Sequence, residues 1–276
     1  MIIDCHCHAG RGDRMSGPWD KRADLTVYLQ RCDAAGISRS VVFAALALDY
    51  RAGNDDVAAL LRAHQRRLLA FVFLDGRMSW LDVETEIRKH VLGNGFVGIK
   101  CHRHDAPISR VICELAARYQ LPVLYDVGGE VATIELFARE YPMMNFIIPH
   151  LGSFADDWKA QLAIIDHVQR HAKVCTDTAG VRRFDYIADA IARAGAHKVL
   201  FGSDGPWLHP GVELAKIKWL GLNAADYAKV TGGNLLRLLG RRVRTSAAVT
   251  ADFSQRPQQS LQVSSAALFA TEWRAQ

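Results

Sequence analysis

The sequence alternates short runs of β-branched and aliphatic residues with longer amphipathic stretches, and it does so eight times. Such alternation predicts consecutive βα units and hence a parallel sheet whose strands are joined by helices. The expected strands are 1–5, 39–46, 68–75, 96–102, 122–127, 145–150, 173–178 and 198–203. The expected helices are 24–35, 55–65, 81–91, 109–119, 130–140, 158–171, 185–194 and 211–220. Eight units in about 240 residues match a (β/α)8 barrel better than a doubly wound open sheet. We therefore predict an α/β protein with a single TIM-barrel domain over residues 1–240.

The ends of the predicted helices carry their own signals. Gly36, Gly93 and Gly195 each follow a helix, where a left-handed C-terminal cap is expected. A last helix over 224–238 is expected to close the underside of the barrel. From Arg241 to Gln276 the alternation stops and Gln, Ser, Thr and Ala dominate. This composition predicts a loosely ordered C-terminal tail, with docking onto a partner subunit as the alternative.

Composition narrows the class of protein. With 50% hydrophobic and 23% charged residues, the chain has the composition of a soluble globular protein, and its apolar runs fall short of the roughly 18 residues of a membrane span. A secretory signal pattern is not seen after Met1, so a cytoplasmic location is the default and the six cysteines are expected to be reduced. The formal net charge of +5 falls to about +2 without the arginine-rich tail, which is too weak for a nucleic-acid footprint.

Functional residues of a barrel gather at the C-terminal ends of its strands. The first strand ends in His6 and His8, and the period of two along a strand places both imidazoles on one face. Cys5 and Cys7 then fall on the other face, toward the surrounding helices. Two imidazoles on one face form a ready metal chelate, whereas the C-x-C pair has no second cysteine pair to complete a thiolate site.

The eighth and sixth strands add two more polar residues. Asp204 follows an apolar run, where a buried carboxylate needs a cation or hydrogen-bond donors. A metal held by His6 and His8 is such a partner, although an Asp-Gly-Pro turn explains the residue as well. His150 ends the sixth strand, where a histidine can donate and accept protons at neutral pH, or hold the structure together.

Strands four and five offer further charged groups. Lys100 and His102 share one face, and a lysine inside a barrel needs an anion. That anion is a substrate carboxylate, Asp204, or Asp126 at the end of the fifth strand. Asp177, which ends strand seven, is expected either to bind substrate or to cap the next segment.

Several short motifs resemble the amidohydrolase superfamily, and more narrowly its amidohydrolase-2 branch of aminocarboxymuconate-semialdehyde decarboxylase, aromatic-acid decarboxylases and lactone hydrolases. The resemblance covers residues 1 to about 240. The motifs are His6-x-His8, Gly98-Ile99-Lys100-Cys101-His102, Leu121-Pro122-Val123-Leu124, His150-Leu151-Gly152 and Gly202-Ser203-Asp204-Gly205-Pro206.

The resemblance implies one divalent ion, zinc in the first place and manganese or magnesium otherwise, bound by His6, His8 and Asp204. It also implies that His150 transfers protons. The branch usually has a histidine ligand after the fifth strand, and this chain has Asp126 there. A carboxylate in that place is either still a ligand, which favours harder ions, or no longer a ligand, so that three protein ligands remain.

Two enzyme functions follow from these residues. The first is hydrolysis of a small carbonyl compound, such as a lactone, ester or amide, by a metal-activated water, with Asp204 as base and His150 as acid or oxyanion partner. The second is non-oxidative decarboxylation of an aromatic or muconate-like acid, whose carboxylate Lys100, His102 or Arg14 would hold.

The residues leave two further hypotheses about function open. A phosphodiester-cleaving barrel usually has a glutamate on strand four, where this chain has Lys100 or His102. A metal-free binding barrel would have no physical reason to keep the histidines and Asp204. Trp19 and Trp207 are candidates for walls of a small-molecule pocket, and a homodimer is the usual assembly in the branch that the chain resembles.

Overall fold

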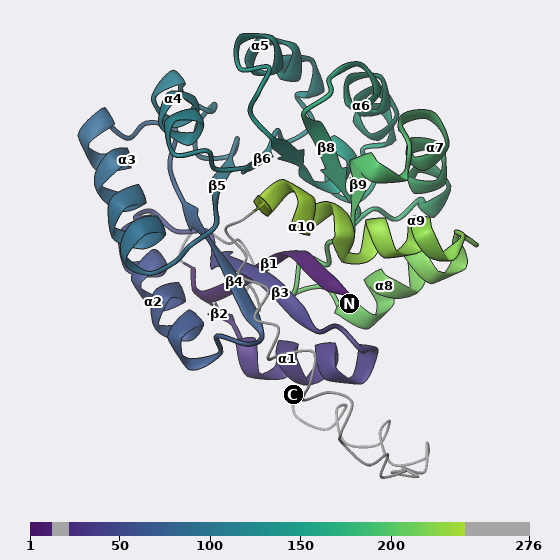
Figure 1. Cartoon of the computed structure of the whole chain (residues 1–276), viewed down its shortest axis with the longest axis horizontal. Helices are drawn as coiled ribbons and strands as arrows, with labels where there is room; N and C mark the ends of the chain where they lie inside the picture. The colour runs from purple at the N-terminus through teal and green to yellow at the C-terminus, as the bar shows by residue number, and fades with distance from the viewer. Residues whose placement is uncertain (13–21, 241–276) are drawn as a thin grey trace. The chain divides into compact units, whose positions relative to one another are not determined.

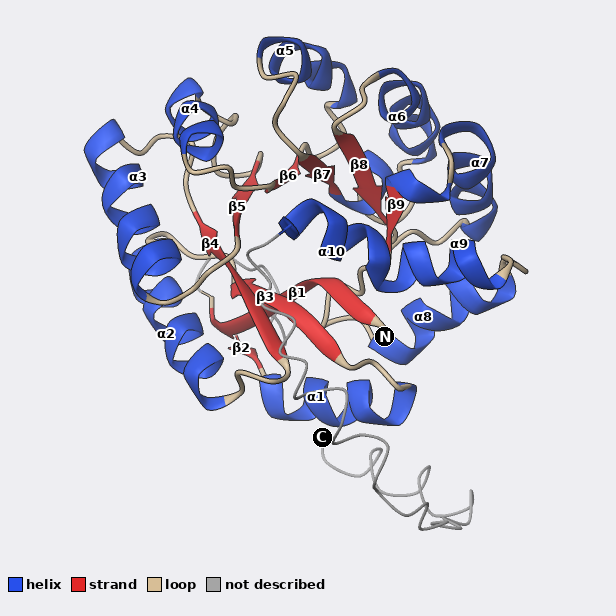
Figure 2. Cartoon of the chain, viewed as in Figure 1, coloured by secondary structure: helices blue, strands red, loops and turns tan. Residues whose placement is uncertain are grey.

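Eight parallel strands run through the part of the chain that the computed structural model describes, residues 1–12 and 22–240. They are separated by helices that lie outside them (Figure 2). A short strand, β2 (Arg22–Ala23), pairs antiparallel with the end of β1. The parallel strands are β1 (Ile3–Arg11), β3 (Arg39–Ala44), β4 (Leu68–Phe73), β5 (Gly98–His102), β6 (Val123–Asp126), β7 (Phe146–Ile148), β8 (Val174–Asp177) and β9 (Val199–Leu200).

The barrel closes between β1 and the segment that follows β9. The Cys5 amide donates to the Phe201 carbonyl at 3.0 Å, the Asp204 amide to the His6 carbonyl at 2.8 Å, and the His8 amide to the Gly205 carbonyl at 2.7 Å. The strand expected at 198–203 is shorter in the structure, because only Val199 and Leu200 pair with β8. The segment after β9 nevertheless completes the ring through the hydrogen bonds to β1 given above. The predicted (β/α)8 barrel is confirmed: β1 pairs with β3 on one side, as Figure 1 shows, and Cys7 bridges to Gly205 on the other.

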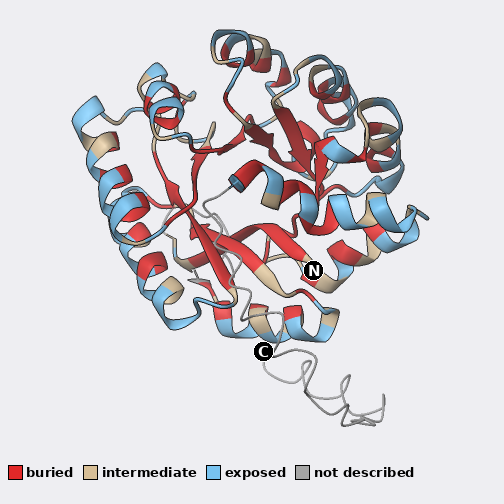
Figure 3. Ribbon diagram, in the orientation of Figure 1, coloured by how far each residue is buried: buried red, intermediate tan, exposed pale blue. Residues whose placement is uncertain are grey.

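The helices alternate with the strands as the sequence predicts. Many begin where a side-chain oxygen accepts a backbone N–H, as Asp24, Asp49, Ser79, Ser109 and Asp157 do. Their buried faces turn toward the strands and their outer faces are exposed (Figure 3). The helices are α1 (Leu25–Ala35), α2 (Tyr50–Ala63), α3 (Trp80–Ile87), α4 (Arg110–Arg118), α5 (Ile134–Glu140), α6 (Trp158–Arg170), α7 (Phe184–Ala194), α8 (Pro210–Trp219), α9 (Ala224–Ala228) and α10 (Asn234–Leu239).

Two expectations about helix ends are wrong. Gly36 is a left-handed cap, with φ 77° and ψ 22°, but Gly195 has ψ 147° and lies outside that region. Gly93 ends a π-helical turn without positive φ, and the left-handed residue is Gly95. The last helix is not continuous, because a π-helical turn over Lys229–Gly233, with a non-helical backbone at Gly232 (φ 170°, ψ −32°), separates α9 from α10.

The strands are buried on both faces, as in a barrel enclosed by helices. Beneath the closure, Asp4 is fully buried and accepts hydrogen bonds from the Tyr28 hydroxyl at 2.7 Å and the Ser203 amide at 2.9 Å. Burial raises the pKa of Asp4 to about 6, although these hydrogen bonds oppose the change. This carboxyl thus joins β1 to α1 and to the chain after β9.

All six cysteines are free and buried, as expected for reduced thiols. Among the described residues, no helix combines the length and apolar character that a membrane span requires. The predictions for the tail 241–276, for Arg14 and for Trp19 concern positions outside the described residues.

Candidate metal centre and active site

A bulge in β1 sets the direction of its side chains. Asp4 pairs with Ser40 and Cys7 with Val42, so β1 has one more residue than β3 between the two pairs. The Cys7 thiol faces Tyr28 of α1, as predicted. The expectation that Cys5 also faces the helices is wrong, because its Sγ lies 3.9 Å from the Asp177 carboxylate. The two histidines nevertheless converge on the same point.

The outer ring nitrogens of His6 and His8 are held by hydrogen bonds. His6 Nδ1 donates to Asp177 Oδ2 and His8 Nδ1 donates to the Ala44 carbonyl, each at 2.9 Å. Burial lowers the pKa of His6 to about 3 and that of His8 well below its usual range, so both rings are neutral. Each Nε2 therefore presents a lone pair. This arrangement, a metal-facing nitrogen with its opposite N–H bound to a carboxylate or carbonyl, is typical of histidine ligands.

Asp204 completes this group. Its Oδ1 lies 3.5 Å from the Nε2 atoms of both His6 and His8, and the three ligand atoms are all within 4.8 Å of one another. His6 Nε2 is buried and has no hydrogen-bond partner within residues 1–12 and 22–240. Burial raises the pKa of the Asp204 carboxyl to about 7, and Asp177 and Asp126 add to the effect. Two neutral imidazoles and a buried carboxyl whose ligand atoms converge fit one divalent ion.

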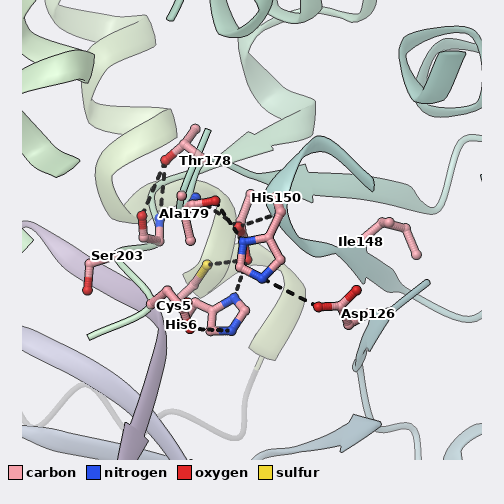
Figure 4. Close-up of polar contacts among 12 residues, drawn as sticks. Cys5, His6, Asp126, Ile148, His150, Thr178, Ala179 and Ser203 are labelled. Atoms are coloured by element: carbon pink, nitrogen blue, oxygen red, sulfur yellow. Dashed lines mark hydrogen bonds and ion pairs between the residues drawn. The ribbon is translucent and has the colours of Figure 1, made fainter. Parts of the chain in front are cut away.

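His150 lies beside this group on an irregular turn after β7. Its φ of 59° and that of Leu151, 48°, are left-handed, a conformation that non-glycine residues rarely adopt and that is frequent at active sites. Its amide donates to Asp177 Oδ1 at 3.0 Å and its Nδ1 to the Ala179 carbonyl at 2.7 Å. Figure 4 shows the ring between Ala179 and Asp126, with His6 next to it.

Asp126 makes His150 a cation. Burial would lower the pKa of His150, but the Asp126 carboxylate, 3.4 Å from Nε2, outweighs it and the pKa rises to about 9. Asp126 Oδ2 also lies 3.2 Å from His102 Nε2, and its Oδ1 accepts from the Gly128 amide at 2.8 Å. Its own pKa is well below the usual range, because the charges of His102 and His150 outweigh its burial. The carboxylate therefore binds two histidines.

This geometry bears on two predictions for Asp126. It does not share a ligand group with His6 and His8 among the described residues, so its role as a metal ligand stays a prediction. Lys100, its expected partner, makes no ion pair with it in the described part of the chain. Lys100 is fully buried, its Nζ lies 4.9 Å from the Phe43 ring centre, and no described residue forms a hydrogen bond with it.

Lys100 and Trp207 each have a buried donor without a hydrogen-bond partner among the described residues. Burial lowers the pKa of Lys100, while Asp126, Asp204 and Asp177 oppose that change. The Trp207 ring lies 4.6 Å from that of His8, and its Nε1 is buried without a hydrogen-bond partner. Both predicted substrate-binding residues thus lie at the site.

Sequence reasoning missed the part that Asp177 plays. Its carboxylate accepts from the Ala179 amide and so caps the segment after β8, as one of the two expectations had it, but it also accepts from His6 Nδ1 and the His150 amide. The signal that could have found it is its position at the end of a barrel strand, next to the expected histidines. Asp177 therefore couples the metal-facing histidine to the proton-transfer candidate.

The barrel and the histidine–carboxylate group at its mouth define the class: a metal-dependent (β/α)8-barrel enzyme. A family model described as amidohydrolase matches residues 3–241, and the chain belongs to the amidohydrolase family. The resemblance seen in the sequence is thereby confirmed. No curated protein sequence matches the chain.

Solved structures with the same fold include decarboxylases and hydrolases. The 2,6-dihydroxybenzoate decarboxylase from Rhizobium superposes with a TM-score of 0.66 at 16% identity, over 87% of this chain and 99% of that one. A dihydroxybenzoic acid decarboxylase from a Polaromonas species, with bound manganese and 2-nitroresorcinol, gives 0.67 and 16% over 88% and 99%. A probable 2-pyrone-4,6-dicarboxylic acid hydrolase from Acinetobacter baumannii gives 0.65 and 13% over 87% and 99%.

Proposed function

We propose that this protein hydrolyses a small carbonyl compound, such as a lactone, ester or amide, at a site that binds one divalent ion. The observation that carries the proposal is the convergence of His6 Nε2, His8 Nε2 and Asp204 Oδ1 on one point, beside a histidine held as a cation. A charged acid next to a metal-binding group is what carbonyl hydrolysis needs at neutral pH.

Zinc is the ion we propose first, because two imidazoles and one carboxylate are common zinc ligands. Manganese is the second choice, and the manganese-containing decarboxylase of the same fold supports it. When bound, the ion supplies a water of lowered pKa and polarises the substrate carbonyl. Three protein ligands leave a position for both.

The remaining steps belong to the chain's own residues. Asp204 accepts the proton of the attacking water, and its buried position suits a base whose pKa must approach neutrality. His150, whose Nδ1–H is bound to Ala179, donates from Nε2 to the developing oxyanion or the leaving oxygen. Asp126 is the counter-ion that keeps His150 protonated until that moment.

Decarboxylation is the second candidate, and Lys100 is the observation that favours it. A buried ammonium without a hydrogen-bond acceptor is costly, and a substrate carboxylate would remove that cost. In this case Lys100 and Trp207 hold the acid and His150 protonates the carbon. His102 Nε2 lies 3.2 Å from Asp126 Oδ2, so we propose His102 as a support for the counter-ion.

The test begins with metal content. We expect the barrel site to hold about one ion in protein purified without a tag or chelator, so that Asp204→Asn contains one ion fewer than the wild type and Asp126→Asn contains the same number. A wild type that stays empty after incubation with zinc and manganese would overturn both candidates. Product analysis then separates them: acid release from lactones or esters supports hydrolysis, and carbon dioxide release from aromatic acids supports decarboxylation.

A cytoplasmic location and a homodimer remain parts of this proposal. Sedimentation of the full chain at micromolar concentration measures the second of these directly.

A further inference from the structure

A second group of metal-ligating side chains lies on the outside of the barrel, between the neighbouring helices α5 and α6 (Figure 1). It consists of Glu135 on α5, His167 on α6 and His171 at the C-terminal end of α6. Their ligand atoms all lie within 4.8 Å of one another. We propose that Glu135, His167 and His171 bind a divalent transition-metal ion, with zinc as the reference ion, independently of the site inside the barrel.

The spacing of the two histidines favours chelation. Residues four apart share one face of a helix, and the rings of His167 and His171 are nearly parallel, with an interplanar angle of 7° and centres 6.4 Å apart. Both side chains are mostly buried between the helices. Two imidazoles held in this way lose little freedom when they bind an ion.

The distances to Glu135 match those around a tetrahedral ion. Its Oε1 lies 3.2 Å from His167 Nδ1 and 3.2 Å from His171 Nε2. Ligands about 2.0–2.1 Å from a tetrahedral zinc are about 3.3 Å apart. His171 Nε2 is also sealed from solvent and has no hydrogen-bond partner among the described residues. The group is therefore arranged as a ligand set would be.

Two arginines occupy the carboxylate when no ion is bound. Arg170 contacts Glu135 Oε1, and Arg139 Nε lies 2.8 Å from Oε2. Their side chains are 56% and 73% exposed, so both can turn into solvent. Exposed ion pairs of this kind contribute little to stability, and a chelated dication can displace them. Glu135 is ionised in any case, since its neighbours hold its pKa near 2.

The experiment is equilibrium dialysis of the full chain against micromolar zinc, followed by counting of bound ions by plasma mass spectrometry. We expect the double variant His167→Ala/His171→Ala to bind one ion fewer than the wild type. His64→Ala, at the end of α2, is the matched control and should keep the wild-type count. Unchanged thermal melting in a chelator shows that the double variant is folded.

Two single substitutions test the details. Glu135→Gln should weaken the second ion by more than about tenfold, because even outer partners of metal ligands have that effect. Arg170→Gln should strengthen it about two- to fivefold, as expected when a competing exposed ion pair is removed. Asp204→Asn should leave this ion in place, so loss of the ion in the barrel can be told apart from loss of the ion at Glu135, His167 and His171. An equal zinc count in the wild type and the double histidine variant would overturn the proposal.

Discussion

The charge of His150 depends on Asp126, and its removal gives a prediction with a defined size. The pKa of His150 rises from 6.5 to about 9 in the folded protein, a change of about 2.5 units. At 1.36 kcal/mol per unit this corresponds to about 3 kcal/mol. In Asp126→Asn the burial that opposes protonation is no longer outweighed, so we expect the pKa of His150 to fall to 6.5 or below.

The sign of the stability effect follows from the raised pKa. A histidine whose folded pKa exceeds the unfolded value stabilises the protein fully below pH 6.5, and this contribution is lost as the pH rises through 9. The wild type should therefore be more stable than Asp126→Asn by an amount that shrinks by up to about 3 kcal/mol between pH 6.5 and pH 9. Titrating groups that do not interact with Asp126 cancel in this difference, whereas Asp204, His102 and Lys100 do interact with it, which is why the pKa of His150 is also measured directly.

Two measurements check this prediction on metal-free protein. Urea unfolding at both pH values gives the stability difference, and histidine-selective NMR gives the pKa of His150 itself. Asp156→Asn, which removes an exposed ion pair with Arg182, is the control and should change neither quantity. A His150 pKa that stays near 9 in Asp126→Asn would refute the reasoning.

Other substitutions test other parts of the site. Asp177→Asn removes the acceptor that fixes His6 Nδ1, so metal affinity should fall about 10- to 100-fold in a competition assay with a chelating dye; unchanged affinity would contradict the assigned role. Lys100→Met removes a buried ammonium, so urea unfolding should show about 1 kcal/mol or more of added stability, while kcat/KM falls; a loss of both would show that Lys100 is structural. Tyr28→Phe takes a donor from Asp4 and should cost about 1–3 kcal/mol in the same assay, with metal content unchanged.

The strand pattern predicted the barrel and its mouth because both depend on local periodicity. His6 and His8 lie on the first strand, His150 and Asp204 follow later strands, and the barrel brings these positions together at its mouth. What periodicity cannot show is a deviation from it. The bulge that turns Cys5 toward Asp177 is one such case, since an extra residue changes the alternation only where it occurs.

The sequence also could not show which residues of distant segments contact one another. The choice of Asp126 between Lys100, the metal and the histidines depends on distances of a few tenths of an ångström across the barrel. The left-handed backbone of His150 is imposed by the hydrogen bonds of its amide and ring, which come from β8 and the residues after it. These contacts exist only after tertiary folding.

The closure of the barrel between β1 and the segment after β9 has a consequence for the order of events during synthesis. His8 and Asp204 meet across this seam, although roughly two hundred residues separate them in the chain. Joining ends so far apart costs about 5 kcal/mol of chain entropy, which the rest of the barrel must offset before the two can meet. During synthesis two of the three proposed ligands therefore leave the ribosome long before the third, and the proposed ion site is complete only when almost the whole barrel has emerged.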